Sequence, residues 1–225
     1  HSRMRFAAAL AGVAFANVLV FVQLGIMNSM TTAVMKPYDF FQADIMISAS
    51  DANTLTEGGN VARQWLFQAL ADREVTAGTG LFVGNINWAR ETKTLGLTSF
   101  GIDPVQPDFV NAVLKPKTAT LQLQNSGILD MYARGLPREE AAAIRPQSPA
   151  SFEVSGKTLT LYDTFQGGGG FGGDGYLMMS DQTFLNLFPA RSSAAPDHIL
   201  LQVTRGADPV IVASRLKEII SDKSL

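Results

Sequence analysis

The chain has 225 residues, of which 46% are apolar and only 17% are charged, and its net charge is -2. This length is enough for one large domain or two small ones with a hydrophobic core. The charged fraction lies below the ~25% usual for soluble domains. A nearly neutral balance gives no electrostatic footprint for a nucleic-acid partner. Because the chain has no cysteine, disulfide scaffolds, iron–sulfur clusters, cysteine zinc sites and thiol nucleophiles are excluded.

An uncharged apolar segment runs from Phe6 to Met30, inside a longer stretch without charge between Arg5 and Lys36. As a helix, Phe6–Met30 would span roughly 37 Å at ~1.5 Å per residue, enough to cross a hydrocarbon core of ~30 Å. A cleaved signal peptide is the alternative, but its apolar region usually has only ~7–15 residues. We therefore predict an N-terminal segment, residues 1–35, that contains a retained transmembrane helix.

The residues around this helix predict its orientation and a packing surface. Arg3 and Arg5 precede it, so the positive-inside rule places the N-terminus in the cytoplasm and the chain after Met30 outside the cytoplasm. Ala8, Gly12 and Ala16 form a row of small residues at four-residue spacing, which permits close contact with another membrane helix. A row that is merely tolerated in an alanine-rich helix is an equally simple interpretation.

The rest of the sequence predicts an α+β domain. Alternating and β-rich patterns predict strands at residues 43–49, 75–88, 93–102, 120–130, 152–165, 176–179 and 198–203. The stretch 152–165 is expected to form a hairpin around Ser155-Gly156. Helical spacing and capping residues predict helices at residues 61–70, 108–114, 137–144, 181–188 and 209–220. Among these, Ser180 and Asp208 are expected to cap the last two helices, and Pro209 occupies a first helical position.

A glycine-rich stretch, GGGGFGGDG at residues 167–175, formally contains a dinucleotide-binding pattern. That motif requires a helix that opens directly from the glycines, whereas residues 176–179 have an extended pattern. We interpret the stretch as a mobile surface loop, because glycine has no side chain to bury and loses the most backbone entropy on ordering. Phe171 is its only apolar side chain. It is a candidate contact for a partner protein, with folding back onto its own domain and simple exposure to solvent as alternatives.

No set of residues has the spacing of a catalytic or metal site. His198 lies in an apolar strand, and its neighbour Asp197 would point to the opposite face of that strand, so a packing or surface role is favoured. Trp65 and Trp88 are interpreted as core residues rather than as a carbohydrate platform. We therefore expect no enzymatic activity, no cofactor and no metal.

The order of several segments resembles the DevC-type permease of an ABC exporter, in the MacB/FtsX superfamily. The segments that carry the resemblance are FAAALAGVAFANVLVFVQLG, ADIMISA, WLFQALADREVTAGTGLFVGNINWARETKT, SFGIDPVQPDF, GGFGGDGYLMMSDQTFLNLFP and TRGADPVIVASRLKEII. They cover nearly the whole chain in order, and the block that begins with GGFGGDG is the most specific of them.

The resemblance implies a fold. Such permeases have four membrane helices, with a two-lobed periplasmic domain between the first and the second, so the chain would be the N-terminal part of a longer permease. Residues 36–103 and 196–225 would form a membrane-proximal lobe similar to the porter unit of efflux pumps. Residues 104–195 would form an inserted, membrane-distal lobe.

The resemblance also implies a function and partners. The permease would couple ATP hydrolysis by a separate ABC ATPase subunit to periplasmic movements that drive export. The expected partners are that ATPase, a periplasmic adaptor (membrane fusion) protein, an outer-membrane exit duct and a second copy of the permease, with Phe171 as a candidate adaptor contact. The alternative is a single-pass membrane-anchored sensor or scaffold domain. The reading frame after Leu225 discriminates between them, since only the permease requires three more apolar spans.

Overall fold

The computed structural model describes residues 2–90, 93–170 and 172–221. The chain divides between Lys36 and Pro37 into two compact units, which are described separately. The first unit is a single helix, α1 (Ser2–Met35), that has no buried residue. It is long and apolar enough to cross a membrane, and its most apolar 18 residues have a mean hydropathy of 2.1. The helix predicted at residues 6–30 is thus confirmed. A cleaved signal sequence meets the same criterion, so retention of the helix stays a prediction.

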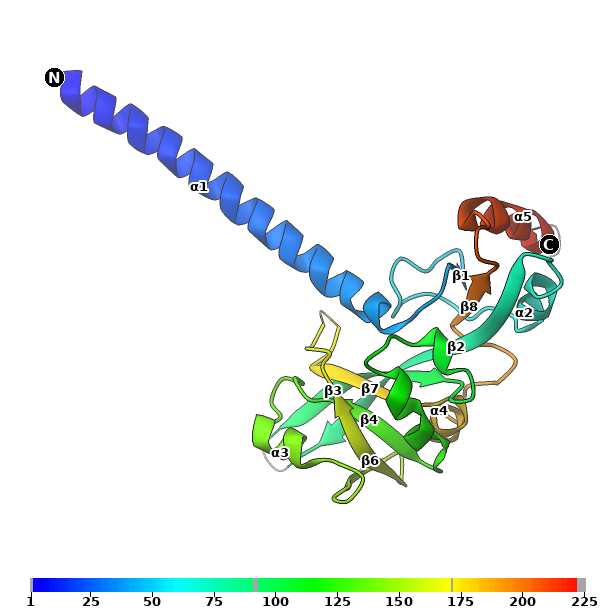
Figure 1. Ribbon diagram of the computed structural model, residues 1–225. Coiled ribbons are helices and arrows are strands. Elements are labelled where there is room, and N and C mark those ends of the chain that lie inside the picture. Colours follow the sequence, from blue (N-terminus) through cyan, green and yellow to red (C-terminus); the bar gives the residue numbers. More distant parts are fainter. Residues whose placement is uncertain (1, 91–92, 171, 222–225) are drawn as a thin grey trace. The chain divides into compact units, whose positions relative to one another are not determined.

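The second unit is built on an eight-stranded sheet with the order β1-β8-β2-β3-β7-β4-β6-β5 (Figure 1). The strands are β1 (Ile45–Ser48), β2 (Val75–Ala89), β3 (Thr94–Ile102), β4 (Ser126–Asp130), β5 (Ala150–Val154), β6 (Lys157–Phe165), β7 (Gly175–Ser180) and β8 (His198–Val203). The β3–β7 and β4–β6 pairs are parallel, and the other neighbours are antiparallel. Every strand overlaps a range that the sequence predicts as extended, although β2, β5 and β7 extend one or two residues beyond the predicted bounds.

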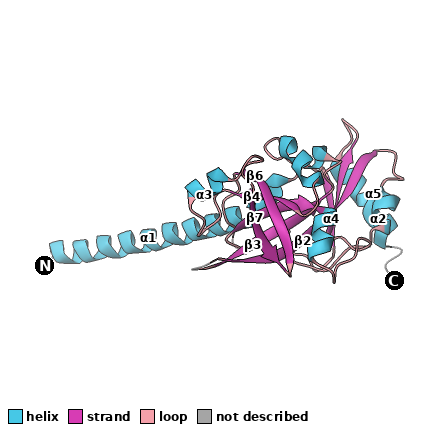
Figure 2. Cartoon of the chain, turned by 90° about the horizontal axis from the view of Figure 1, so that it is seen from below, coloured by secondary structure: helices cyan, strands magenta, loops and turns pink. Residues whose placement is uncertain are grey.

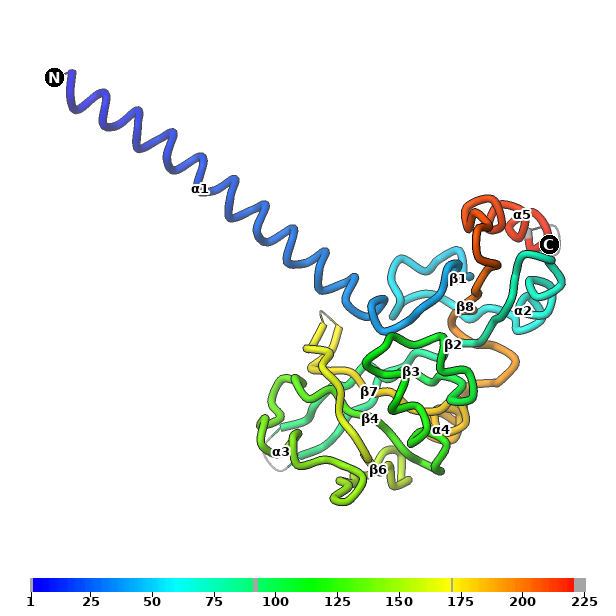
Figure 3. Tube along the Cα trace, in the orientation of Figure 1, coloured from blue at the N-terminus to red at the C-terminus, as the bar shows by residue number. Residues whose placement is uncertain are grey.

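Strand β2 is long because it serves two partners in succession. Its residues 75–81 pair with β8, and its residues 82–89 pair with β3. One continuous strand therefore joins β1 and β8, on one side of the sheet, to β3, β7, β4, β6 and β5 on the other. Figure 3 shows how β1, from the start of this unit, meets β8 near the end of the chain. The predicted division into lobes at residues 104 and 195 stays a prediction. In the structure, β3, which falls in the predicted proximal lobe, lies between β2 and β7, and β7 falls in the predicted distal lobe.

Two helices, which lie next to each other in Figure 2, pack on the β1–β8–β2 part of the sheet. They are α2 (Gln64–Ala69) and α5 (Pro209–Ser221). Leu66 of α2 and Val212 and Leu216 of α5 are buried in one apolar cluster with strand residues of β8. Ile220 of α5 is partly buried against the same cluster, whereas Ile219 is 41% exposed. At the start of α5, the carboxylate of Asp208 accepts a hydrogen bond from the Val210 N–H at 2.9 Å, as the capping prediction requires.

The other part of the sheet is covered by α4 (Asp181–Leu187) and by the short helix α3 (Arg138–Ala143). Ser180 caps α4 by accepting a hydrogen bond from the Thr183 N–H. Phe184 of α4 is fully buried, and a side chain at Gly101 of β3 would lie 2.6 Å from its Cβ. Glycine at that position is what allows α4 to approach the strand so closely.

The predicted hairpin and the predicted core tryptophan are both present. Ser155 and Gly156, which join β5 to β6, have φ angles of 52° and 72°, the positive values that a two-residue hairpin turn of type I′ requires. Trp88 is 9% exposed and stacks on Phe152 of β5, with ring centroids 4.5 Å apart. Trp65 is half-buried beside the α2–α5 cluster, so neither ring is presented as an open platform.

Two predicted elements between β3 and β4 are wrong. Residues 108–114, expected to be helical, contain only the end of the 3-10 turn η2 (Pro107–Phe109), followed by turns. Residues 120–125, expected to be extended, include the end of the 3-10 helix η3 (Lys115–Gln122). The hydroxyls of Thr118 and Thr120 donate to the carbonyls of Lys115 and Lys117. Hydrogen bonds of this kind, from a hydroxyl to the carbonyl three residues earlier, stabilise tight turns. The β-rich composition of this stretch had instead suggested a strand.

Candidate functional site

The described residues contain no group of three or more His, Asp or Glu side chains that could hold a metal ion. His198, the candidate examined most closely in the sequence, is 1% exposed. Its Nε2 lies 2.9 Å from the carbonyl oxygen of Leu55, and its Nδ1 lies 2.7 Å from the hydroxyl of Ser48. Since a carbonyl can only accept, Nε2 carries the proton and Nδ1 accepts from Ser48. Both ring nitrogens are thus engaged, and His198 has a packing role.

Burial lowers the pKa of His198, against the opposing effects of its bond to Leu55 and of the neighbouring Asp197 charge. The imidazole is therefore held neutral, because the charged form would lose its hydration without gaining an ion pair. In this state, His198 joins β8 to β1 and to the loop that follows β1. It has no nitrogen left over for proton transfer.

The glycine-rich stretch is not the exposed mobile loop that the sequence suggested. Gly167 and Gly170 are buried, and the Gly167 N–H donates to the carboxylate of buried Asp130 at 2.9 Å. The guanidinium of Arg134 donates to the carbonyl oxygens of Gly170 and Gly173. A side chain at Gly169 would lie 2.6 Å from the backbone oxygen of Asp174. Gly167 and Gly169 leave no room for a side chain, because the backbone there packs closely against Asp130 and Asp174, contacts that no local pattern reveals.

The remaining candidates from the sequence are not brought together with any other group. Phe171 lies outside the described residues. Ala8, Gly12 and Ala16 are exposed along α1, and nothing lies within 4 Å of the position that a side chain on Gly12 would occupy. The small-residue row thus stays a prediction about helix packing.

The structure instead draws attention to the place where β2 changes partners. The segment 194–197 lies there between β2 and the chain that leads into α2. The Pro196 carbonyl accepts a hydrogen bond from the Val61 N–H at 2.8 Å. The Asp197 N–H donates a hydrogen bond to the carbonyl oxygen of Leu81 in β2 at 3.0 Å. We call residues 60–63, 78–83 and 193–197 the strand junction. It connects segments that are more than a hundred residues apart in the sequence.

Asp197 is the central side chain of the strand junction, and it is 9% exposed. One carboxylate oxygen accepts from the Val83 N–H at 2.7 Å and pairs with Arg191. The other accepts from the Asn60 side chain at 3.2 Å. Three separate segments thus meet at one carboxylate. The charge-assisted hydrogen bonds involved are about twice as strong as neutral ones.

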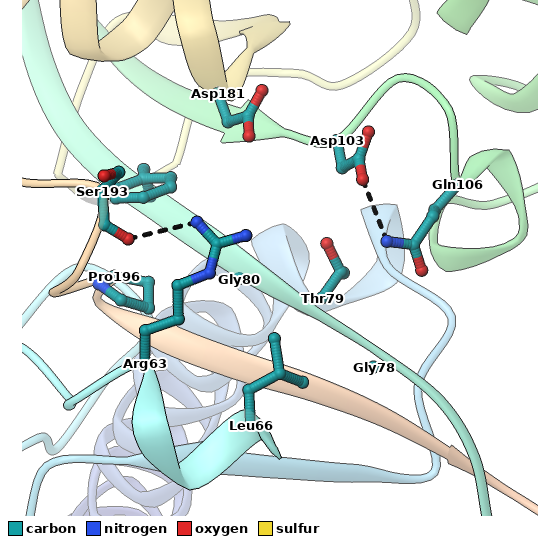
Figure 4. Close-up of a pocket in the computed structure, with 11 residues that line it drawn as sticks. Arg63, Leu66, Gly78, Thr79, Gly80, Asp103, Gln106, Asp181, Ser193 and Pro196 are labelled. Atoms are coloured by element: carbon teal, nitrogen blue, oxygen red, sulfur yellow. Dashed lines mark hydrogen bonds between the residues drawn. The ribbon is translucent and has the colours of Figure 1, made fainter. Parts of the chain in front are cut away.

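A small cavity of about 40 Å³ adjoins the junction (Figure 4). Arg63 points into it and donates to the Ser193 carbonyl at 3.3 Å. On the other side, Asp103 accepts from the Gln106 side chain at 2.9 Å, and Asp181 lies nearby at the start of α4. Gly78 of β2 forms part of the floor, where a side chain would lie 2.5 Å from Leu66.

The electrostatics of this cavity are set by its two carboxylates. Burial, followed by the charge of Asp103, raises the pKa of Asp181, whereas the Gln182 N–H and the charge of Arg63 lower it. The cavity has room for little more than ordered water. Its charged residues come from the start of α2, the segment after β3 and the start of α4, and the space between them is too small to enclose a substrate.

No protein-family model matches the sequence, and no curated protein is similar enough in sequence to count as a relative. Solved structures do match. The periplasmic region of MacB from Actinobacillus actinomycetemcomitans has a TM-score of 0.53 at 10% identity, over 79% of this chain and 81% of that one. The extracellular domain of the noncanonic ABC-type transporter YknZ from Gram-positive bacteria has a TM-score of 0.51 at 10% identity, over 81% and 94% of the two chains. The chain thus shares the α+β fold of these domains.

Sequence reasoning missed the strand junction. Asp197 was considered only as a possible partner for His198, and Arg63, Asp103 and Asp181 were not singled out. Two long-range strand pairings bring these residues together. The pairing of β3 with β7 places Asp103 beside Asp181, and the pairing of β2 with β8 places the segment of Asp197 beside that of Arg63. The one local signal is the glycine pair Gly78 and Gly80 within a strand, a pattern that marks close approach of another backbone.

Proposed function

We propose that the chain is the N-terminal portion of a permease subunit of an ABC-type export system, of the DevC type within the MacB/FtsX superfamily. The observation that carries the proposal is the fold that the chain shares, over 79–81% of its length, with the periplasmic region of MacB and the extracellular domain of YknZ. A helix long and apolar enough to cross a membrane precedes this domain. In the proposal, α1 is the first span in the inner membrane, with its N-terminus in the cytoplasm and the sheet domain in the periplasm.

The permease works with a separate ATPase subunit, a periplasmic adaptor and an outer-membrane exit duct. Hydrolysis by the ATPase changes the arrangement of the membrane helices, and the periplasmic domain transmits that movement to the adaptor. The continuous strand β2 and the Asp197 contacts at the strand junction support this role, because they make one mechanically connected body of the sheet. The proposal assigns the chain itself no catalytic reaction and no cofactor.

The complete gene product, purified in mild detergent from its native membrane, tests the proposal. We expect an ATP-hydrolysing subunit to co-purify with it, and a phosphatase fused after Leu225 to be active in the periplasm. A single-pass sensor or scaffold would show the same phosphatase activity without any ATP hydrolysis. An inactive phosphatase fusion, together with a fluorescent reporter that is active in the cytoplasm when fused at the same position, would overturn the topology and, with it, the export function.

The permease is expected to function as a homodimer in which α1 contributes a packing surface. Because the chain has no cysteine, Ala8→Cys introduces a single thiol on the row of small residues. We expect this variant to form a disulfide-linked dimer in the membrane, and we expect Gly12→Leu in the same background to reduce the yield, because a bulky side chain separates closely packed backbones. An equal yield in both proteins would show that the row has no role in packing.

A further inference from the structure

A second hollow, with a volume of about 540 Å³, lies on the same unit at the start of α4. We call it the amide groove. The residues that line it come from the connection after β3, from the segment between η3 and β4, and from α4: Pro104, Val105, Leu121, Gln122, Leu123, Gln124, Asn125, Ser180, Gln182, Thr183 and Asn186. Its volume falls within the ~300–1,000 Å³ range of ligand sites. None of the features discussed above involves these side chains except the Ser180 cap.

The lining combines polar and aliphatic residues and carries no charged side chain. Five of the eleven lining residues are glutamines or asparagines, and no aromatic residue is among them. An ionic ligand would find no opposite charge among the lining residues, and the ammonium of Lys157, which adjoins them, already donates to Asn186. A sugar ring would find no aromatic face among the lining residues on which to stack. The chemistry of the groove therefore favours a neutral ligand with hydrogen-bond donors and acceptors.

One side of the groove is rigid. The Asn186 side chain donates to the Asn125 side chain at 2.8 Å and accepts from Lys157 at 2.7 Å. Asn125 has a φ of 50°, a left-handed conformation that asparagine adopts more readily than most residues. Because Lys157 fixes Asn186, and Asn186 in turn fixes Asn125, this wall is preorganised before any ligand arrives.

The other amides are available. Gln122, Gln124 and Gln182 are exposed, and their side chains make no hydrogen bond to any residue that the structure describes. Each carries two N–H donors and a carbonyl acceptor. That combination matches a peptide group, which offers one acceptor and one donor. A helix already uses these groups internally, so only an extended segment can present them to the groove.

Two aliphatic side chains complete the site. Val105 is 74% exposed and Leu123 is 49% exposed, on two different segments that line the groove. They can bury an apolar side chain of the ligand, which contributes roughly 0.8 kcal/mol per buried CH₂. We propose that the amide groove binds an extended, uncharged polypeptide segment of a partner protein. The proposal rests on this groove alone and does not depend on the export function.

The test uses the full chain in lipid nanodiscs and side-chain amide NMR signals of Gln122, Gln124 and Gln182. The probe is a pool of pentapeptides with blocked termini, built only from Gly, Ser, Asn, Leu and Val. A total concentration of ~5 mM detects dissociation constants near ~1 mM. We expect saturable shifts of these three signals. Pools with Lys or Glu at alternate positions should bind several-fold more weakly, because charged side chains lose hydration without finding a partner.

Matched variants identify the site. We expect Leu123→Ala and Gln182→Ala each to weaken binding about fivefold, the effect of one lost aliphatic contact or hydrogen bond. Both residues are exposed, so the fold is retained. Leu70→Ala and Gln147→Ala replace exposed residues of the same types outside the groove and should leave binding unchanged.

Three results would overturn the proposal. The first is the absence of shifts with the neutral pool, and the second is equal or tighter binding of a charged pool. The third is saturable binding of a neutral oligosaccharide, with maltotetraose as the probe, in place of the peptides. None of these results bears on whether an ATPase subunit co-purifies with the complete gene product, so failure of the groove and failure of the export function are distinguishable.

Discussion

The carboxylate of Asp197 accepts a hydrogen bond at 2.7 Å from the backbone N–H of Val83, two residues beyond the end of the β2–β8 pairing. The contact lies where β2 leaves one neighbour for the next, and the same carboxylate also pairs with Arg191. A side chain therefore supplies the hydrogen bond that a neighbouring strand would otherwise give. The stability of the strand junction therefore depends on the buried carboxylate of Asp197.

We predict that Asp197→Ala lowers the free energy of unfolding by about 2–3 kcal/mol, because it leaves the Val83 N–H and the Arg191 charge without their partner. Urea denaturation measures the change. The control is Asp108→Ala, which removes a carboxylate whose side chain is 68% exposed and, within the described part of the chain, pairs only with Lys115. That surface pair should contribute less than about 1 kcal/mol. Similar losses in the two variants would contradict the assigned role of Asp197.

His198 predicts a pH dependence of stability. Burial places its folded-state pKa below the ordinary value of about 6.5. As the pH falls through about 6.5, the unfolded chain binds a proton that the native state does not bind, so stability is lost on acidification. We predict that His198→Gln destabilises the protein at about pH 7.5 by ~1–3 kcal/mol through weakened hydrogen bonds. The difference in unfolding free energy between wild type and variant should narrow towards pH ~5.5, because only the wild type has a histidine at this position that is protonated on unfolding.

The measurement is denaturation of both proteins across this pH range. His1 and all carboxylates are common to both proteins, so their contributions cancel in the difference. A difference in stability that stays constant with pH would mean that the pKa of His198 is the same in the folded and unfolded states.

The glycine-rich stretch predicts opposite outcomes for two alanine substitutions. Gly169→Ala places a methyl group 2.6 Å from the backbone oxygen of Asp174 and should cost about 1–3 kcal/mol of stability through overpacking. Gly172→Ala meets nothing within 4 Å and should change stability by less than about 0.5 kcal/mol. Urea denaturation compares the two variants. If Gly169→Ala were as well tolerated as Gly172→Ala, the packed arrangement around Arg134 would be wrong.

The hydroxyl of Tyr176 is buried without a hydrogen-bond partner among the described residues. Burial, with a contribution from Asp130, raises the pKa of Tyr176 to about 12. We predict that Tyr176→Phe changes stability by less than about 0.5 kcal/mol or increases it, since it removes an unsatisfied polar group from the core. Ultraviolet titration should show one tyrosine fewer ionising near pH ~12 in the variant. A loss above ~1 kcal/mol would indicate that the hydroxyl has a partner, such as buried water.

The sequence alone was sufficient where the determinants are local. The Ser155-Gly156 turn, the Ser180 cap of α4 and the Asp208-Pro209 start of α5 each depend on a few adjacent residues whose backbone preferences agree with the final structure. The apolar segment at residues 6–30 is equally self-contained, because length and hydropathy are sufficient to define it. Segment order along the chain likewise indicated the fold that the solved MacB and YknZ domains share.

The tertiary structure decided everything that depends on which segments meet. Alternation along residues 75–88 indicates a strand, but not that β8 pairs with its first half and β3 with its second. Glycine composition suggested a mobile loop because the pattern cannot show that Arg134, more than thirty residues earlier, donates to its carbonyls. Asp197 is unremarkable in the sequence for the same reason. Its partners are chosen by long-range strand pairing, and the energy of such a contact depends on burial that no local pattern encodes.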